Sequence, residues 1–364
     1  MSIPSSRTIN YDAMLSSVLD NYKDKMQDVI FSSSVLLSAI KKHGGYETRE
    51  GGEKISVPLM YGKTPVQSYS GYDVLDTTPV DGITRAFYEW RQLATPIAIS
   101  RIEERKNTGE AQLFNLLKEK IQQAEMSIAE EVNYQLLGKS VESGAFVSGN
   151  GGDDLDPIPL LVPKNPSTST SIGNINQSTY SWWRNKSVDG STNGATSQDS
   201  GTVKGYDLNT WAELHMALRH LYNQCSRGSG GTPKMVITDQ DGYETFEASL
   251  ADKVRYTQQT DGSLAFDNIL FKKGCPMYWD EMVPDLENGV NYESASHATS
   301  TYFMLNTQFL KFIVDAQTNF INTPFTKPEN QDAKVAHILL YGNLCCTNRR
   351  KQGVLYGVSQ SITS

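Results

Sequence analysis

The sequence has no long apolar run, and this absence excludes the simplest membrane architecture. No stretch near 18 residues in the 364-residue chain is predominantly apolar, and the mean hydropathy is -0.43. A membrane-spanning helix needs about 20 such residues, so none is expected. The first residues, MSIPSSRTINYDAML, lack a basic segment followed by an apolar one, so no secretory signal is predicted. The protein is therefore expected to work in the cytoplasm where it is made, without a membrane partner.

Cysteine and histidine are both scarce. No C-x-x-C pair occurs among the four cysteines, which are Cys225, Cys275, Cys345 and Cys346. We expect them to be small buried apolar residues rather than disulfide or metal ligands. His215 and His220 are five residues apart on an expected helix, so they cannot share a metal as an i, i+4 pair does. No metal and no cofactor are predicted.

Motifs for catalysis are incomplete. The GKT at Gly62–Thr64 and the GKS at Gly138–Ser140 both lack the first glycine of a phosphate-binding loop. The segment DQDGYETFE, from Asp239, departs from a calcium-binding loop after its first three residues. These failures predict that the protein is not an enzyme.

Acidic residues are missing from the C-terminal part of an otherwise acidic chain. The net charge is -8 and the pI is near 5.3, so the chain has no overall nucleic-acid signature. After Asp332 there is no further acidic residue, while Arg349, Arg350 and Lys351 follow one another. This pattern indicates a basic tail on an acidic body.

Apolar residues at helical spacing predict several helices. They run from Tyr11 to Ile30 and through SVLLSAIKKHGG, which ends on Gly44–Gly45 with lysines in its last turn. The clearest helix is expected over about 108–138, where one apolar stripe contains Leu113, Leu117, Ile121, Ala124, Ile128, Val132 and Leu136. A helix of roughly 30 residues is about 45 Å long, so it should be a structural spine.

Two segments, KISVPLMYG and ITRAFYEWRQLATPIAIS, predict the two long strands of a hairpin. The stretch between them is rich in Pro, Gly, Thr and Tyr. Such an arm has too little apolar content to fold alone and needs a partner surface. From about 143 to 205 no periodicity survives. A further helix, a strand–turn–helix segment and β-rich segments follow, which together predict an α+β fold.

Three large aromatic residues stand inside the aperiodic segment, in TYSWWRN. One interpretation is a stacking platform for a ligand. The favoured one is that Tyr180, Trp182 and Trp183 anchor the segment to the body below, since each buries on the order of 150–250 Å². Adjacent residues of an extended stretch point in opposite directions, so the two tryptophans are expected to pack on different surfaces.

Taken in order, these segments resemble the major capsid proteins of tailed bacteriophages, which have the Hong Kong ninety-seven type of shell fold. The resemblance covers nearly the whole chain. It is carried by SVLLSAIKKHGGYETREGGEKISVPLMYG, SYSGYDVLDTTPVDGITRAFYEWRQ, ERKNTGEAQLFNLLKEKIQQAEMSIAEEV, GGTPKMVITDQDGYETF and QDAKVAHILLYGNLCCTNRRKQGVLYG. SIGNINQSTYSWWRN is similar to a family motif in which a Gly-Ile pair precedes Trp-Trp-Arg-Asn, although Asn174 here separates Gly173 from Ile175.

The resemblance implies a division of the chain into parts. They are an N-terminal arm over 1–45, an extended hairpin loop over 46–98, a peripheral domain over 99–230 with the spine helix (about 108–138) and the irregular insert (143–205), an axial domain over 231–330, and a return to the peripheral domain over 331–364. The arm and the hairpin are expected to lie on neighbouring subunits. The candidate inter-subunit contacts are Tyr61, Lys63, Tyr69, Tyr72, Tyr88 and Trp90.

The implied function is structural: a subunit that self-assembles into hexamers and pentamers of an icosahedral head shell around double-stranded DNA. Because the arm begins within about ten residues of Met1, a separate scaffolding protein is expected, together with a portal at one vertex and a possible decoration protein. Assembly is expected in the host bacterial cytoplasm. Arg349, Arg350 and Lys351 are expected to face the genome or, as favoured, carboxylates at a subunit interface. No partner for a crosslink from Lys63 is evident, so no covalent crosslink is predicted.

Two alternatives remain. One keeps the fold and changes the cargo, as in an encapsulin-like nanocompartment. The other is a carbohydrate-binding or hydrolytic protein that uses Trp182 and Trp183, with Asp153 or Asp154 as acids.

Overall fold

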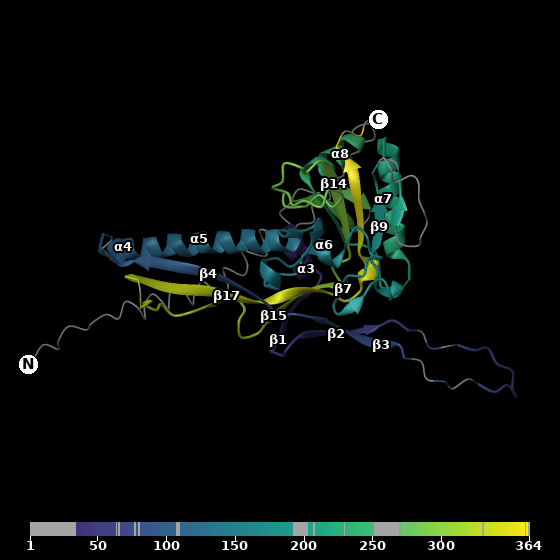
Figure 1. Ribbon diagram of the computed structural model, residues 1–364, viewed down its shortest axis with the longest axis horizontal. Coiled ribbons are helices and arrows are strands. Elements are labelled where there is room, and N and C mark those ends of the chain that lie inside the picture. The colour runs from purple at the N-terminus through teal and green to yellow at the C-terminus, as the bar shows by residue number, and fades with distance from the viewer. Residues whose placement is uncertain are drawn as a thin grey trace, which may run out of the picture.

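The structure is a computed structural model, and it describes residues 34–360 and 362 except 63, 65, 76–77, 79–80, 107–109, 192–202, 207, 229, 251–268, 273 and 330. The helix expected between Tyr11 and Ile30 lies outside the described residues. Figure 1 shows a long limb formed by one helix and two strands, a bulkier part that contains α7, α8 and β14, and a narrow hairpin that projects from the junction between them.

A five-stranded sheet forms the base of the limb. Its order is β1 (Tyr46–Arg49), β15 (Leu310–Asp315), β17 (Ala333–Cys346) and β16 (Ile321–Asn322), with β4 (Arg91–Ser100) also paired to β17. The 14-residue strand β17 pairs with β4 through its first part and with β15 through its last part. Side chains alternate across a strand, and Ile97, Ile99 and Ile338 are among those buried.

The spine helix, α5 (Glu110–Leu137), packs along β4, and Figure 1 shows it running the length of the limb. Its 28 residues confirm the helix expected over about 108–138. The buried positions Ile121, Ile128 and Val132 belong to the apolar stripe that predicted it. A short helix, α4 (Arg101–Lys106), precedes it.

A seven-stranded sheet forms the bulkier part. Its order is β10 (Val203–Gly205), β9 (Lys186–Asp189), β18 (Gly353–Ser359), β14 (Thr299–Leu305), β11 (Met235–Thr238), β13 (Cys275–Trp279) and β12 (Ile269–Lys272). Helix α7 (Trp211–Ser226) packs on β18 and β9, and α8 (Gln240–Leu250) packs on β13 and β14.

The two sheets do not divide at residues 230 and 330, where the expected domains meet. Strands β9, β10 and β18 belong to the seven-stranded sheet although they lie outside 231–330, while β15 and β16 lie inside that range and belong to the five-stranded sheet. The reason is that pairing joins strands far apart in the chain, and local patterns carry no record of such partners.

The hairpin is shorter than expected. Strand β2 (Ile55–Met60) pairs antiparallel with β3 (Ile83–Tyr88). The expected single strand over 83–100 is interrupted at Glu89–Trp90, after which β4 leaves the hairpin and pairs with β17. Beyond Met60 the two sides of the hairpin remain close together. A Cβ added to Gly62 would lie only 2.6 Å from the Cα of Gly82.

The helix expected in SVLLSAIKKHGG is α3 (Val35–Lys42), and it belongs to the core of its own chain. Ser34 caps its N-terminus, and Leu36, Leu37 and Ile40 have no exposed surface. The apolar face of this part of the range 1–45 is therefore buried in its own chain and is not available to a neighbour. Gly44 follows the helix with a positive φ of 71°, a conformation that suits glycine.

The segment expected to be irregular contains only short elements among its described residues. Strand β5 (Val141–Glu142) precedes it, and its own elements are β6 (Ala145–Phe146), η1 (Asn150–Gly152), α6 (Ile158–Leu161), β7 (Ser171–Ile172), β8 (Ile175–Asn176), η2 (Ser181–Trp183), β9 and β10. Several of its side chains, including Leu155 and Leu161, are nevertheless fully buried. The segment is thus held by side-chain burial rather than by long helices or strands.

Candidate functional site

The hairpin exposes large apolar side chains that its own chain does not cover. One face of the β2–β3 ribbon buries Ile55, Val57 and Leu59 against the body. On the other face Met60 is 83% exposed, and Ile83 and Phe87 are exposed as well. Apolar side chains on both faces of a two-stranded ribbon are typical of an element that packs between two bodies.

The loop beyond the ribbon continues this exposure. Val66, Tyr69, Tyr72 and Val74 are all exposed, and Tyr72 has no contact that reduces its accessible surface. Figure 1 shows this loop as the part of the hairpin farthest from the sheets. Lys63, the other expected contact residue of the loop, lies outside the described residues. This hairpin is the candidate functional site of the molecule.

The root of the hairpin is fastened to the body by aromatic stacking. The rings of Tyr61 and Trp182 are parallel within 10°, with centroids 4.6 Å apart. Tyr180, which is 48% exposed, lies on another side of Trp182 with centroids 5.9 Å apart. Tyr61 was expected to contact another subunit, but its ring is already stacked within its own chain, which leaves it 38% exposed.

Trp183 lies in the core beneath this stack. It is 2% exposed, and its indole N–H donates a hydrogen bond of 2.9 Å to the carbonyl oxygen of Ile172. A buried ring is not accessible to a sugar, so a carbohydrate site formed by both tryptophans is excluded. The adjacent Trp182 is only partly buried. The two tryptophans lie in the 3-10 turn η2 (Ser181–Trp183) and not in the extended stretch that was expected, and their rings pack edge-on with centroids 5.8 Å apart.

Arg349 contacts Trp183 in the protein interior. The guanidinium is fully buried, and it donates hydrogen bonds to the carbonyl oxygens of Leu161 (2.7 Å) and Trp183 (3.1 Å) and to the side-chain oxygens of Gln177 (3.0 Å) and Asn185 (3.3 Å). Burial lowers the pKa of Arg349 to about 10. The expectation that Arg349 faces a genome or a subunit interface is wrong, because its guanidinium is buried and hydrogen-bonded to oxygen atoms of the protein interior.

The other two members of the basic triplet separate. The ammonium group of Lys351 is 3.0–3.3 Å from the carbonyl oxygens of Arg227, Gly228 and Gly231, and the residue is 2% exposed. Burial lowers the pKa of Lys351. The expectation that Lys351 faces the genome or a subunit interface is therefore also wrong. Arg350, in contrast, is exposed. The sequence shows only that three basic residues follow one another. This pattern does not indicate which of them are buried.

Tyr88 and Trp90 pack within their own chain. Tyr88 is 3% exposed, and its hydroxyl donates a 3.0 Å hydrogen bond to the carbonyl oxygen of Cys346. Burial raises its pKa well above the usual value. Tyr88 is thus not an inter-subunit contact. Trp90 is partly buried, stacks on Tyr341 at 4.9 Å and donates its N–H to the carbonyl oxygen of Gly52.

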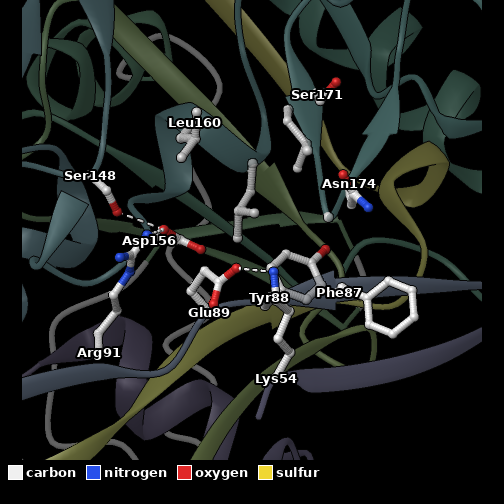
Figure 2. A pocket seen from close by; sticks show the side chains of 13 residues that line it. Lys54, Phe87, Tyr88, Glu89, Arg91, Ser148, Asp156, Leu160, Ser171 and Asn174 are labelled. Atoms are coloured by element: carbon white, nitrogen blue, oxygen red, sulfur yellow. Dashed lines mark hydrogen bonds and ion pairs between the residues drawn. The ribbon is translucent and has the colours of Figure 1, made fainter.

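A cavity of about 290 Å³ is lined by residues of the hairpin root and of the body (Figure 2). Lys54 and Glu89 form an ion pair of 2.6 Å at this cavity. Deeper, Asp156 accepts a hydrogen bond of 2.6 Å from the Ser148 hydroxyl and lies 3.6 Å from the Arg91 guanidinium. The Arg91–Asp156 contact joins β4 to the irregular segment, and the Ser148–Asp156 bond, drawn in Figure 2, holds the carboxylate from within that segment.

Asp156 is also held by the neighbouring strand β17. The amide of Asn343 donates to the Asp156 carboxylate at 2.8 Å and to the carbonyl oxygen of Glu89 at 2.8 Å. The carboxylate thus has three polar partners and acts as a tie between segments. In the described part of the chain, no three His, Cys, Asp or Glu side chains converge on a point where a metal ion would be held. Each described helix is too short or too polar to cross a membrane.

Comparison with known proteins identifies the fold. No family model and no curated protein matches the sequence. Among solved structures, the chain is similar to the capsid asymmetric unit of cyanophage A-1(L), with a TM-score of 0.59 and 12% identity over 86% of this chain and 89% of that one. It is also similar to an encapsulin complex of Synechococcus elongatus PCC 7942, with a TM-score of 0.47 and 9% identity over 88% and 86%. The capsid of Myoviridae phage XM1 has a TM-score of 0.46 and 10% identity over 87% and 91%.

The cyanophage likeness, at 12% identity, shows the fold of this chain. It is the α+β fold of the phage capsid proteins of Hong Kong ninety-seven type, with a projecting hairpin and a spine helix.

Proposed function

We propose that this chain is the structural subunit of a virion shell and that copies of it assemble through the hairpin. The observation that carries the proposal is the exposed apolar surface of the hairpin, which includes Met60, Tyr69 and Tyr72. The shared fold with a phage capsid protein supports the same role.

Burial on a neighbour supplies the driving force for assembly. Covering one large apolar side chain contributes about 1.5–3 kcal/mol before ordering costs. A hairpin on one subunit and a different surface on the next make a heterologous contact, and such contacts close into rings when the rotation closes. Rings of one wedge-shaped subunit then form a shell. In this proposal the rings are hexamers and pentamers.

The remaining roles follow from the same proposal. The five-stranded sheet with α5 forms the peripheral domain, and the seven-stranded sheet forms the axial domain. The enclosed cargo is double-stranded DNA, which a subunit of net charge -8 holds without specific contacts. A separate scaffolding protein, a portal and a possible decoration protein are further partners. The head is assembled in the cytoplasm of a bacterial host.

Electron microscopy of the purified protein tests the proposal. The chain is expressed alone and together with a separate scaffolding protein, separated by size and imaged in negative stain. Closed icosahedral particles are the expected result. A chain that remains monomeric in both preparations contradicts it. Nuclease-protected DNA in native particles supports the cargo assignment, and particles that enclose only protein favour the encapsulin-like alternative.

A further inference from the structure

Three cationic residues belong to three segments that are distant in the chain and adjacent in the fold. Lys186 begins β9, Arg227 follows the last residue of α7, and Arg350 lies within η5 (Arg349–Lys351). Hydrogen bonds bring these segments side by side. The backbone N–H of Lys186 donates to the carbonyl oxygen of Gln352 at 3.0 Å, and the ammonium group of Lys351 donates to that of Arg227 at 3.0 Å.

The three charges have no compensating carboxylate among the described residues. None of Lys186, Arg227 and Arg350 takes part in an ion pair within that part of the chain. Burial lowers the pKa of Lys186, and the positive charges of Arg350 and Arg227 lower it further. Arg227 and Arg350 are exposed, and Lys186 is half-buried. The cluster therefore repels itself and presents its charge to solvent.

Nearby acidic groups are engaged elsewhere. Asp189, at the other end of β9, accepts a hydrogen bond from the backbone N–H of Ser191 at 2.9 Å and faces Tyr356. The carboxylate of Glu287 lies near Lys164, not near the cluster. An anion from outside the chain would thus relieve a repulsion that the chain itself leaves in place.

We propose that Lys186, Arg227 and Arg350 form a carboxylate-binding site for an acidic side chain of a second copy of this chain. The proposal rests on the proposed assembly of copies into a shell. An arginine guanidinium binds a carboxylate through two parallel hydrogen bonds, which supplies geometric specificity. Lys186, as a compact point charge, adds attraction without fixing the angle.

Charge complementarity favours a carboxylate over a nucleic acid. The chain has 41 acidic and 33 basic residues, so a second copy presents more carboxylates than any other charged group. Binding to a phosphate backbone draws its affinity from many basic contacts along a surface. This cluster has only three basic side chains, and the chain as a whole has a pI near 5.3.

Zero-length crosslinking tests the contact directly. Shells are assembled from an equal mixture of unlabelled and nitrogen-15-labelled chains and treated with a water-soluble carbodiimide. The carbodiimide adds to a carboxylate and activates its carbonyl carbon. The amine of Lys186 attacks that carbon, an amide bond forms, and the carbodiimide leaves as a urea. The amide bond therefore forms only between groups in contact. Mass spectrometry is expected to find Lys186 joined to an Asp or Glu peptide in mixed-isotope pairs, which only two different chains can produce.

Matched variants separate charge from reactivity. Lys186→Arg keeps the charge and lacks the amine, so it should assemble normally and lose the crosslinked peptide. The double variant Arg227→Glu/Arg350→Glu should assemble more slowly by on the order of tenfold at low salt, with a smaller difference at high salt. Arg350→Lys is the conservative control. Circular dichroism of the unassembled chains checks that these exposed substitutions leave the fold intact.

The outcomes distinguish this site from the proposed function. Shells in which Lys186 forms no inter-chain amide overturn the site and leave the proposed function standing. Glutamate variants that assemble at the normal rate but enclose less nucleic acid also overturn it, in favour of a nucleic-acid contact. A wild-type chain that never assembles overturns the proposed function and this site with it.

Discussion

The guanidinium carbon of Arg349 lies 5.7 Å from the centre of the Trp183 ring, and the same group donates a 3.1 Å hydrogen bond to the Trp183 carbonyl oxygen. The contact continues outward. Trp183 packs edge-on against Trp182 at 5.8 Å, and Trp182 stacks on Tyr61 at the hairpin root. One buried cation thus positions the segment that positions the hairpin.

Replacing Arg349 should destabilise the subunit strongly. Arg349→Lys keeps a charge but cannot reach four oxygen atoms with one ammonium group, and each buried acceptor left unpaired costs about 1–3 kcal/mol. We expect a loss of roughly 2–5 kcal/mol in the free energy of unfolding, measured by urea denaturation of the unassembled chain. The exposed neighbour provides the control, since Arg350→Ala should change stability by about 0.5 kcal/mol or less. Equal effects at the two positions would contradict this account.

Removing the Trp183 ring should also destabilise the fold. Trp183→Ala leaves a cavity and an unpaired carbonyl oxygen at Ile172. A buried Trp→Ala substitution costs about 3–5 kcal/mol, so the variant should unfold at lower urea concentration and assemble poorly. Tyr180→Ala, at a half-exposed position in the same segment, should be close to wild type. A Trp183→Ala chain with wild-type stability and normal shells would show that the ring is no anchor.

The elements with a periodic pattern were predictable from the sequence. The apolar stripe of α5 is one continuous feature, and its buried members Ile121, Ile128 and Val132 recur at helical spacing. The closing glycines and the lysines in the last turn predicted α3 too. In both cases the information is local, because a helix satisfies its own backbone hydrogen bonds.

The rest depends on partners far along the chain. Nothing around Tyr88 signals that β3 ends there and that β4 pairs with β17, more than two hundred residues away. The basic triplet appeared as a surface feature, although Arg349 is buried among oxygens of Leu161, Trp183, Gln177 and Asn185. Tertiary contacts decide whether a charged side chain is buried, and these contacts cannot be derived from the local pattern of one sequence.

The stack of Tyr61 on Trp182 should hold the hairpin at a defined angle to the body. Tyr61→Ala removes it, and a stacked aromatic pair contributes about 0.5–1.5 kcal/mol beyond its buried area. We expect faster limited proteolysis within the loop between β2 and β3, and a red shift of the tryptophan fluorescence as Trp182 becomes hydrated. Tyr61→Phe retains the ring and serves as the control. Identical proteolysis of both variants would indicate that the stack does not restrain the hairpin.

Exposed loop residues should affect assembly without affecting the stability of the subunit. Tyr72→Ser changes a fully exposed side chain, so the unfolding midpoint of the unassembled protein should remain unchanged. If Tyr72 is buried on a neighbour, its loss weakens each contact by about 1.5–3 kcal/mol, and the critical concentration for assembly rises, as measured by light scattering. Ser70→Ala, in the same loop, is a control of similar exposure. Unchanged assembly of Tyr72→Ser would remove this residue from the interface.

The subunit should lose stability on acidification through Asp285. Burial alone would raise the pKa of this carboxyl, but hydrogen bonds from Thr299, Asn288 and Ala298 outweigh it and lower the pKa overall. The native state therefore favours the ionised form. Its contribution is present above the unfolded pKa of about 3.9 and is lost as the pH falls through the lower native value. Asp285→Asn should be less stable than wild type at neutral pH by about 1–3 kcal/mol, and the difference should shrink towards acid.

Asp239 provides a control of opposite sign. Burial raises its pKa, against hydrogen bonds from Ser300 and Thr238. Its contribution to stability is therefore fully present below the unfolded pKa and declines as the pH rises through the native value. Asp239→Asn, which resembles the protonated acid, should lose least relative to wild type at neutral pH and more in acid. Urea denaturation between roughly pH 3 and pH 7 measures both variants. Parallel pH profiles for the two substitutions would show that these carboxyls do not titrate as their surroundings require.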